Sequence, residues 1–397
     1  MVAKYIMNER IRRILKGNID GMGIFVLMLG IFSYIMFVIK WESDLCAHVH
    51  IAQQMLEEHR LFSTNFLMYF LINLLTLFTG YKYPMRGALV LLLALANTAK
   101  YTIVRNAFYE WTSSKIAKWA AFSMLFVYVI PIMYFLKPFG IFLSADHMYI
   151  GYYVPNVWHN STILCMMPFA IACYLLSVKQ FRQYTDRRNW QILLLLTLSV
   201  LVKPSFFFVY IIAFPIIMLS RYGLKQEFFK SLLPLLAGGL CLAYEYITIY
   251  YDGGSDGSGV AIDIAQLFTL SFWQSHDLYL VVSLAFPLLF LCLYGRAVIR
   301  DPEFWFVLIM TVCGIGMMWC CKETGPRATH GNFNWQAIAT MWFVYFYILK
   351  TASQIAKKYH PPHGGGYSQI TILLAFGTHV VMGFVYLAKF LITHNYG

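Results

Sequence analysis

Charge is the scarcest property of this sequence. Only 12% of its 397 residues are Asp, Glu, Lys or Arg, with 18 acidic residues against 30 basic ones. With 60% hydrophobic residues and a mean hydropathy of +0.62, the chain cannot remain soluble as a monomer. A net charge of +12 would suggest nucleic acid in a soluble protein. Here the cations mostly flank apolar runs, so they are better explained as topology signals.

Several other features are absent. None of the eight cysteines has zinc-ligand spacing and most lie in apolar runs, so neither a zinc module nor a disulfide framework is expected. No small-residue cleavage site follows the basic start and the first apolar run, so we expect that run to remain as a helix. No internal repeat is visible, which argues mildly against a transporter built from repeated halves.

What the sequence does contain is a series of long apolar runs. Strands would need alternating segments of about 10 residues, and these runs do not alternate. The sequence therefore predicts an all-α integral membrane protein, a polytopic bundle of about 11–13 transmembrane helices with no soluble domain, in which residues 1–397 form one transmembrane domain. We place membrane segments at residues 22–40, 62–79, 86–104, 118–136, 161–178, 189–202, 204–219, 231–250, 277–295, 303–321, 334–350 and 369–392.

The stretch 189–219 is too long for one ordinary span. Lys203-Pro204 interrupts it, because proline lacks a backbone donor and disfavours helix in the residue before it. We therefore expect two short helices that meet at Lys203.

Basic residues in short connections predict the orientation of the bundle. They place the N-terminal tail and the connections near residues 179–188, 221–230, 296–300 and 350–358 inside. External loops then cover residues 41–60, which include an interfacial helix, and residues 137–160, 252–276 and 322–335. One conflict remains, since four segments separate external residue 44 from internal residue 179. Either one segment is re-entrant, or a further crossing lies between residues 61 and 160.

The first candidate group is Asp44 with His48, in the loop that follows the first helix. Both residues have the spacing of one face of a short helix lying along the membrane interface. A carboxylate in a first helical turn also serves as a simple cap. A partly desolvated carboxylate facing a hydroxyl group would act as a general base, and His48 one turn later would orient it or share a metal ion.

The second group lies in the external loop 137–160. The aromatic residues there would form an interfacial belt in any membrane protein. Clustered polar groups at a membrane face also mark functional sites. The polar and aromatic candidates for binding a sugar or an acceptor are Asp146, His147, Trp158, His159 and Asn160.

The third group consists of cations in polar loops. Lys203 either extends its amine to the lipid headgroups or contacts a lipid-linked phosphate. Lys322, Arg327 and His330 are cations on the side where topology does not require them, which favours binding of phosphate or pyrophosphate. Asn332 and Trp335 follow in the same loop and are candidates for the sugar or acceptor cleft.

The order of these features resembles the polytopic glycosyltransferases of the GT-C superfold, in a poorly characterised bacterial branch. Asp44 with His48 stands where that family has its catalytic acidic residue. The runs 154–162, 203–205 and 331–335 look like short motifs of such proteins, and the resemblance covers most of the chain. The chain departs from better-known members because Ser43 separates Glu42 from Asp44 and no C-terminal soluble domain follows. A divalent metal is therefore left open, and a large protein acceptor is not expected.

The resemblance implies a multi-pass enzyme of the bacterial inner membrane whose active site faces outside. It would move a hexosyl or pentosyl group from a polyprenyl-phosphate donor to a glycan or glycolipid acceptor of the cell envelope, in polysaccharide biosynthesis. Its partners would be this donor, this acceptor and the lipid bilayer, without nucleic acid. Asp44 would deprotonate the acceptor hydroxyl, and the cations Lys203, Arg327, His330 and Lys322 would hold the leaving phosphate.

Other functions stay open at this point. An O-antigen-type polymerase would use a lipid-diphosphate donor, and paired external arginines would favour it. A lipid-linked sugar transporter or flippase would place charges near the bilayer midplane, where Glu245 and Lys100 are the only residues in favour. Helix–helix hydrogen bonding explains Lys100, Asn73 and Asn97 equally well. A purely structural membrane partner would not need cations outside.

Overall fold

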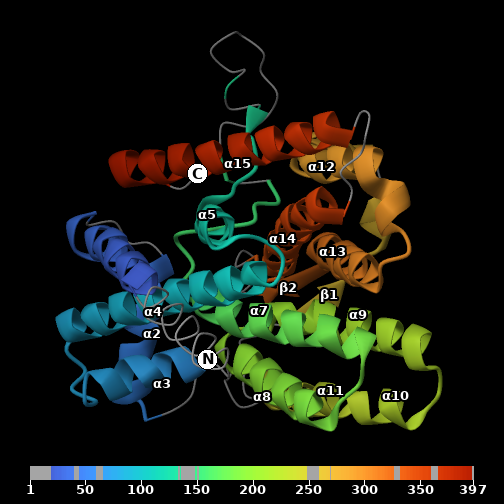
Figure 1. The fold of residues 1–397 in the computed structure, drawn as a ribbon. Coiled ribbons are helices and arrows are strands. Elements are labelled where there is room, and N and C mark those ends of the chain that lie inside the picture. The colour runs from blue at the N-terminus through green and yellow to red at the C-terminus, as the bar shows by residue number, and fades with distance from the viewer. Residues whose placement is uncertain are drawn as a thin grey trace, which may run out of the picture.

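The computed structural model describes residues 19–39, 44–59, 66–132, 135, 148–149, 152–247, 259–268, 270–325, 331–358 and 365–395. The protein is an all-α polytopic membrane protein (Figure 1). Within the described residues, eight helices are long and apolar enough to cross a membrane, and the first of them is Ile19–Val38. The predicted fold class is therefore confirmed.

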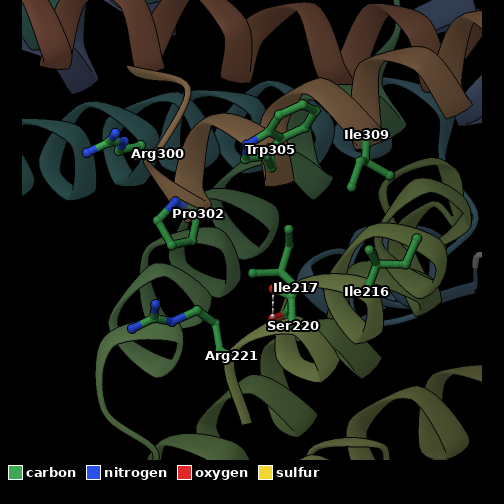
Figure 2. A pocket seen from close by; sticks show the side chains of 8 residues that line it. All are labelled: Ile216, Ile217, Ser220, Arg221, Arg300, Pro302, Trp305 and Ile309. Atoms are coloured by element: carbon green, nitrogen blue, oxygen red, sulfur yellow. Dashed lines mark hydrogen bonds between the residues drawn. The ribbon is translucent and has the colours of Figure 1, made fainter. Parts of the chain in front are cut away.

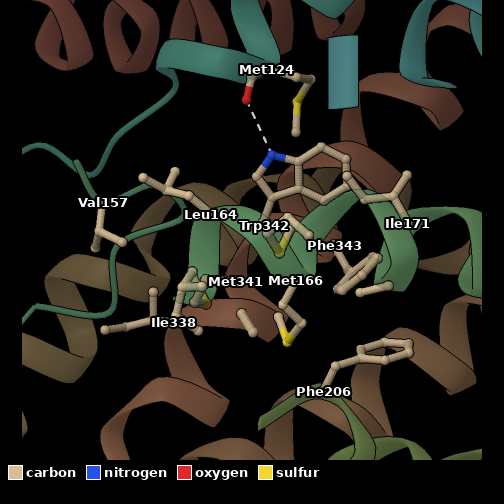
Figure 3. Packing of buried hydrophobic residues seen from close by; sticks show 14 of the residues in the cluster. Met124, Val157, Leu164, Met166, Ile171, Phe206, Ile338, Met341, Trp342 and Phe343 are labelled. Carbon is tan, nitrogen blue, oxygen red and sulfur yellow. Dashed lines mark hydrogen bonds between the residues drawn. The ribbon is translucent and has the colours of Figure 1, made fainter. Parts of the chain in front are cut away.

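Two helices form the centre of the bundle. Most residues of α7 (Ser161–Arg182) are buried, and so is the first part of α14 (Asn334–Lys358). Helices that are apolar on all sides belong in the interior, surrounded by other helices. Leu164 and Met166 of α7 and Trp342 of α14 lie in this core, together with Met124 and Phe206 from neighbouring helices (Figure 3).

The outer helices surround this centre. In Figure 1, α15 crosses the top of the view and α8, α10 and α11 lie at the bottom. α4 packs on α5 and α7, α7 on α8, α8 on α11, and α13 on α9 and α14. These helices are α4 (Lys82–Tyr109), α5 (Ser114–Phe126), α8 (Asp186–Val202), α9 (Ser205–Tyr222), α10 (Gln226–Ser231), α11 (Leu233–Ile247), α12 (Leu270–Val298), α13 (Pro302–Cys320) and α15 (Gly365–Thr393).

The break at Lys203-Pro204 is confirmed. α8 ends at Val202, Lys203 has an extended backbone, and α9 begins at Ser205. Proline at this position ends one helix and starts the next, because it cannot donate a backbone hydrogen bond. The break leaves the Lys203 side chain at a helix junction.

The segment between the first helix and α4 does not cross the membrane. It holds α2 (Asp44–Glu57) and α3 (Phe66–Leu75), and ten helical residues span only about 15 Å of the ~30 Å apolar core. Positive φ angles at Leu77 and Phe78 turn the chain back after α3. The predicted span at residues 62–79 is therefore wrong, and the parity conflict disappears because this segment returns to the end of the bundle from which it came.

The helix expected in loop 41–60 is present as α2, and its position along the membrane interface stays a prediction. Its buried face consists of Leu45, Val49, Ala52 and Met55, which recur every three or four residues. Asn73 Nδ2 of α3 donates to the Ala52 carbonyl oxygen at 3.0 Å, and this hydrogen bond links α3 to α2.

The segment predicted to span residues 118–136 is not one continuous helix, because α5 runs from Ser114 to Phe126 and residues 127–131 are not helical. Unpaired backbone groups are costly in a membrane, and here side chains pair with those at the helix end. The Met124 carbonyl accepts from Trp342 Nε1 at 3.1 Å (Figure 3) and from Asn156 Nδ2 at 3.2 Å. Asn156 Nδ2 also donates to the Val127 carbonyl at 2.8 Å.

A small antiparallel sheet, not anticipated from the sequence, joins two of the predicted loops. β1 (Gly259–Ile262) pairs with β2 (Cys321–Thr324) in the register Gly259 to Thr324. One further correction applies to these loops. α12 begins at Leu270, inside the predicted loop 252–276, whereas α14 begins at Asn334, where the predicted segment 334–350 begins.

The two ends of the bundle differ in character. We call the end that holds Asp44, Lys203 and Trp335 the site end. The other end holds the connections after α7, α9 and α12, and basic residues there pair with acids. Lys179 lies 3.0 Å from Glu110, and Lys230 lies 3.4 Å from Asp186.

Candidate functional site

Asp44 opens α2 at the site end and is half-buried. Burial raises the pKa of its carboxyl above the ordinary 3.8, although a hydrogen bond with the Asn160 side chain and the charge of Lys203 both oppose this rise. A carboxylate with a raised pKa beside cations is a typical proton acceptor. Its position in the first helical turn also suits the positive end of the helix dipole.

A chain of polar side chains connects Asp44 to Lys203. Asn160 bonds Asp44 and, through its Oδ1, accepts from Thr162 Oγ1 at 2.9 Å. Thr162 Oγ1 in turn accepts from Lys203 Nζ at 3.1 Å. Three segments far apart in sequence therefore meet at one place, and each member restricts the orientation of the next.

Asn160 also caps α7. Its Oδ1 accepts from the backbone amide of Ile163 at 3.0 Å, the usual arrangement of an asparagine cap. The same side chain therefore fixes the start of α7 and bonds Asp44. Capping alone accounts for its contact with Ile163, but not for its contact with the carboxylate.

Lys203 points into the protein rather than toward lipid headgroups. Its side chain is almost fully buried, and its amine lies 5.0 Å from the ring centre of Trp335. A cation over the face of an indole is attracted by the ring quadrupole. His159 lies beside the same indole, with ring centres 6.0 Å apart, so Trp335 joins Lys203 and His159 in one cluster.

His48 and His159 are both neutral at physiological pH. Burial lowers the pKa of His48 to about 3, with the charge of Lys203 adding to the effect, and burial lowers the pKa of His159 to about 3. His48 Nδ1 lies 2.7 Å from the Tyr69 hydroxyl, which fixes its ring. Neither imidazole supplies a cation for phosphate at neutral pH.

A cavity of about 570 Å³ opens beside Asp44. Asp44 and His50 of α2 form part of its wall, and Lys82 and Arg86 at the start of α4 form another part. Arg86 Nη1 reaches the Met36 carbonyl at 3.5 Å and Nη2 reaches Cys46 Sγ at 3.8 Å, both weak contacts. Within the described residues its Nε is buried without a hydrogen-bond acceptor. The cavity therefore combines one carboxylate with two cations.

Two candidate residues of the predicted loop 322–335, Lys322 and Asn332, contact acidic side chains. Lys322 is exposed and forms an ion pair with Asp263 at 3.1 Å, across the small sheet. Asn332 Nδ2 donates to Glu323 Oε2 at 2.6 Å, and Glu323 is buried. Arg327 and His330 lie outside the described residues, as do Asp146 and His147 of loop 137–160.

Trp158 is a packing residue in this structure. It is buried, and its ring lies 6.0 Å from that of Phe32 and 5.6 Å from that of Phe126. The structure thus unites Asp44, His48, Asn160, Lys203, His159 and Trp335, and it places Trp158, Lys322 and Asn332 in other contacts.

Sequence reasoning missed four members of the site end. Tyr69 lies in an apolar helix, where a single hydroxyl gives no signal, and Thr162 ends the run 154–162 but was not among the candidate site residues. Lys82 and Arg86 follow the run 62–79, whose prediction as a crossing separates them from the loop that holds Asp44. The parity conflict in the sequence pointed to this error. Without a crossing at residues 62–79, Lys82 and Arg86 lie on the same side of the membrane as Asp44.

Metal binding and intramembrane charge give fewer clues. Among the residues that the structure describes, no three His, Cys, Asp or Glu side chains gather closely enough to hold a metal ion. Lys100 is buried in α4 and donates to Asn156 Oδ1 at 2.6 Å. This bond links α4 to the non-helical segment before α7 and gives Lys100 a packing role, while the Glu245 side chain lies outside what is described.

Comparisons with known proteins assign no family to this chain. No protein-family model matches the chain, and no curated protein matches it. Among solved structures, the apo-form crystal structure of the Archaeoglobus fulgidus oligosaccharyltransferase resembles it with a TM-score of 0.41 and 12% sequence identity. That match covers 94% of this chain but only 56% of the archaeal chain. At this level of similarity, the likeness assigns no residue role and no activity to the protein.

Proposed function

We propose that this protein is a membrane glycosyltransferase that moves a sugar from a polyprenyl-phosphate donor to a glycan or glycolipid acceptor. One observation carries the proposal. Asp44, with its raised pKa, shares the wall of a 570 Å³ cavity with Lys82 and Arg86 at one end of an apolar bundle. A base next to cations at the membrane boundary suits a donor whose phosphate is polar and whose tail is lipid.

In the proposed reaction, the Asp44 carboxylate takes the proton of the acceptor hydroxyl. That oxygen forms a bond to the anomeric carbon of the donor sugar, and the bond between this carbon and the phosphate oxygen breaks. The polyprenyl phosphate leaves with the bonding electron pair and one more negative charge. Positive groups nearby stabilise that charge as it develops.

Lys82 and Arg86 are the proposed phosphate ligands. Arginine binds phosphate through several donors at once, and the buried Nε of Arg86 is such a donor. Lys203 is a positioning residue, because it acts on Asp44 through Thr162 and Asn160 and through its charge. Arg327 and His330 keep their proposed role as further phosphate ligands.

The proposed site faces the outside of a bacterial inner membrane. Support comes from the opposite end of the bundle, where the helix ends beside short connections carry Lys179, Arg182, Arg187, Arg221 and Lys230. Basic residues in short loops favour the cytoplasmic side, which leaves the site end outside.

A lipid-diphosphate polymerase is the second candidate. The pairing of Lys82 with Arg86 on one cavity favours it, since a pyrophosphate carries more negative charge than a phosphate monoester. The two candidates differ in the donor alone, so a donor panel separates them.

The test is sugar release from a panel of polyprenyl-phosphate and polyprenyl-diphosphate sugars by the purified protein, with crude acceptor lipids present. Asp44→Asn is expected to reduce turnover about 10²–10⁴-fold, as loss of a general base does. Arg86→Gln is expected to raise the KM for the donor roughly 10–100-fold, because one charge-assisted contact is lost. Arg187→Gln at the opposite end is the charge-matched control. Release from no donor, or full activity of folded Asp44→Asn, would contradict the proposal.

A further inference from the structure

A second cleft lies at the opposite end, between α9 and the start of α13. It encloses about 400 Å³. Its lining includes Arg221 and Ser220 from the last turn of α9, and Arg300 from the turn before α13. None of these residues belongs to the proposed glycosyl-transfer site.

The cleft has a charged side and an apolar side. In Figure 2, the guanidinium groups of Arg221 and Arg300 lie toward one side, and Ile216 and Ile309 lie toward the other. Trp305 stands between them, and its indole Nε1 donates to the Ile299 carbonyl at 2.8 Å. Tryptophan at the boundary between apolar and polar surroundings is typical of the membrane interface.

The two arginines retain donors for an anion. Arg221 Nε donates to the Phe181 carbonyl oxygen at 3.1 Å. The two terminal nitrogens of its guanidinium group are left as donors for a ligand in the cleft. The nearest acid in sequence to Arg300 is Asp301, which is engaged elsewhere. Its Oδ1 accepts from the Glu303 amide at 3.0 Å and its Oδ2 from the Tyr347 hydroxyl at 3.1 Å. Within the described chain, neither arginine forms an ion pair with a carboxylate.

We propose that this cleft binds an anionic diacyl phospholipid. Its phosphate would lie between Arg221 and Arg300, and an acyl chain would lie along Ile216 and Ile309 past Trp305. Basic pockets between transmembrane helices recognise anionic headgroups in this way. A purely topological role explains two arginines near the cytoplasm, but not an apolar continuation of the same cleft.

This site is separate from the proposed active site. α9 begins two residues after Lys203 and holds 18 residues, so it puts roughly 27 Å between Lys203 and Arg221. Binding at one end is therefore tested without the sugar donor, and its outcome does not depend on the proposed function.

The experiment is native mass spectrometry of the full chain in detergent, titrated with phosphatidylglycerol or phosphatidylcholine. The wild type is expected to retain phosphatidylglycerol at least about tenfold more tightly. The double variant Arg221→Gln/Arg300→Gln is expected to lose this preference. The double variant Arg182→Gln/Arg187→Gln removes the same charge from exposed positions at the same end, and it is expected to keep the preference. Equal loss in both double variants would overturn the proposal in favour of a diffuse basic belt.

Two further arms keep the test decisive if the arginine variant misfolds. Ser220→Trp keeps both arginines but fills the cleft from an exposed position, and it is expected to abolish the preference. Retained phosphatidylglycerol in folded Ser220→Trp would overturn the proposal. Glycerol 1-phosphate, the head of the lipid without its chains, is expected not to compete at millimolar concentration. Efficient competition would replace the lipid site by a site for soluble phosphate esters.

Discussion

Lys203 Nζ donates to Thr162 Oγ1 at 3.1 Å, across 41 residues of sequence. The bond joins the break between α8 and α9 to the first turn of α7. Because Thr162 continues to Asn160 and Asp44, a helix junction and a candidate base become parts of one network. This network is the basis of the first four predictions.

Asp44→Asn is expected to remove activity without lowering stability at neutral pH. Its raised pKa means that the folded state disfavours the ionised carboxylate, so a neutral amide of the same shape relieves this cost. Turnover and thermal unfolding are measured on the same preparation. If Asp44 were only a helix cap, activity would persist, because asparagine caps a helix about as well as aspartate does.

The pH dependence of stability has a definite sign. Between 3.8 and the raised pKa of Asp44, the folded state binds more protons than the unfolded state, so the free energy of unfolding falls as pH rises. The contribution is fully present below 3.8 and is lost as pH passes the folded value. Unfolding of wild type and Asp44→Asn from pH 3 to pH 8 checks this, and the variant is expected to show a smaller fall.

Lys203→Gln is expected to move the acid limb of the pH–rate profile to higher pH. The nearby positive charge lowers the pKa of Asp44, so its removal raises that pKa further. Lys203→Arg keeps the charge and is expected to leave the limb closer to its wild-type position. Lys225→Gln, at an exposed position of the opposite end, is the control. An unchanged limb in Lys203→Gln would show that Asp44 does not control the rate.

Thr162→Val is expected to destabilise the protein by about 1–3 kcal/mol, because a buried donor on Lys203 loses its acceptor. Thr162→Ser keeps the hydroxyl and is expected to restore most of the stability and of the KM for the donor. Unfolding in detergent and initial rates measure both. Equal defects in the two variants would point to the methyl group rather than the hydroxyl.

The buried ion pair between Lys350 and Glu303 gives a prediction away from the site. Glu303 also accepts from the Tyr174 hydroxyl at 2.8 Å, and the Lys350 amine lies 4.9 Å from the Trp111 ring centre. Lys350→Met leaves a buried carboxylate and is expected to cost about 3–5 kcal/mol. Adding Glu303→Leu is expected to recover much of that loss. A double-mutant cycle by unfolding measures the coupling, and additive losses would contradict it.

Gly383 allows α15 to approach α5 closely. A Cβ at this position would collide with the Phe126 carbonyl oxygen, whereas a Cβ at Gly377 of the same helix meets nothing within 4 Å. Small residues permit such contacts between membrane helices. Gly383→Ala is therefore expected to lower the unfolding temperature, and Gly377→Ala to leave it unchanged or raise it slightly. Equal effects would show that α15 tolerates displacement.

Part of the candidate site was predictable from the sequence. The rarity of polar residues made Asp44, His48, Asn160 and Lys203 conspicuous, and the structure brings these four together. Tyr69 escaped notice because one hydroxyl in an apolar helix has no distinctive pattern, and Thr162 entered only as the last residue of the run 154–162. The sequence also did not predict that α3 returns to the same end of the bundle. An apolar run of that length looks the same whether it crosses the bilayer or returns.

The sequence by itself determined the class of protein, the break at Lys203-Pro204 and the short helix α2 after the first apolar run. Each follows from local chemistry, namely the length of apolar runs, the missing amide of proline and the spacing of apolar side chains. Only the tertiary structure decided that Lys82 and Arg86 share a cavity with Asp44, and that Lys203 turns inward to Thr162. Those facts depend on which helix ends meet, and helix packing sets them through contacts between residues far apart in the chain.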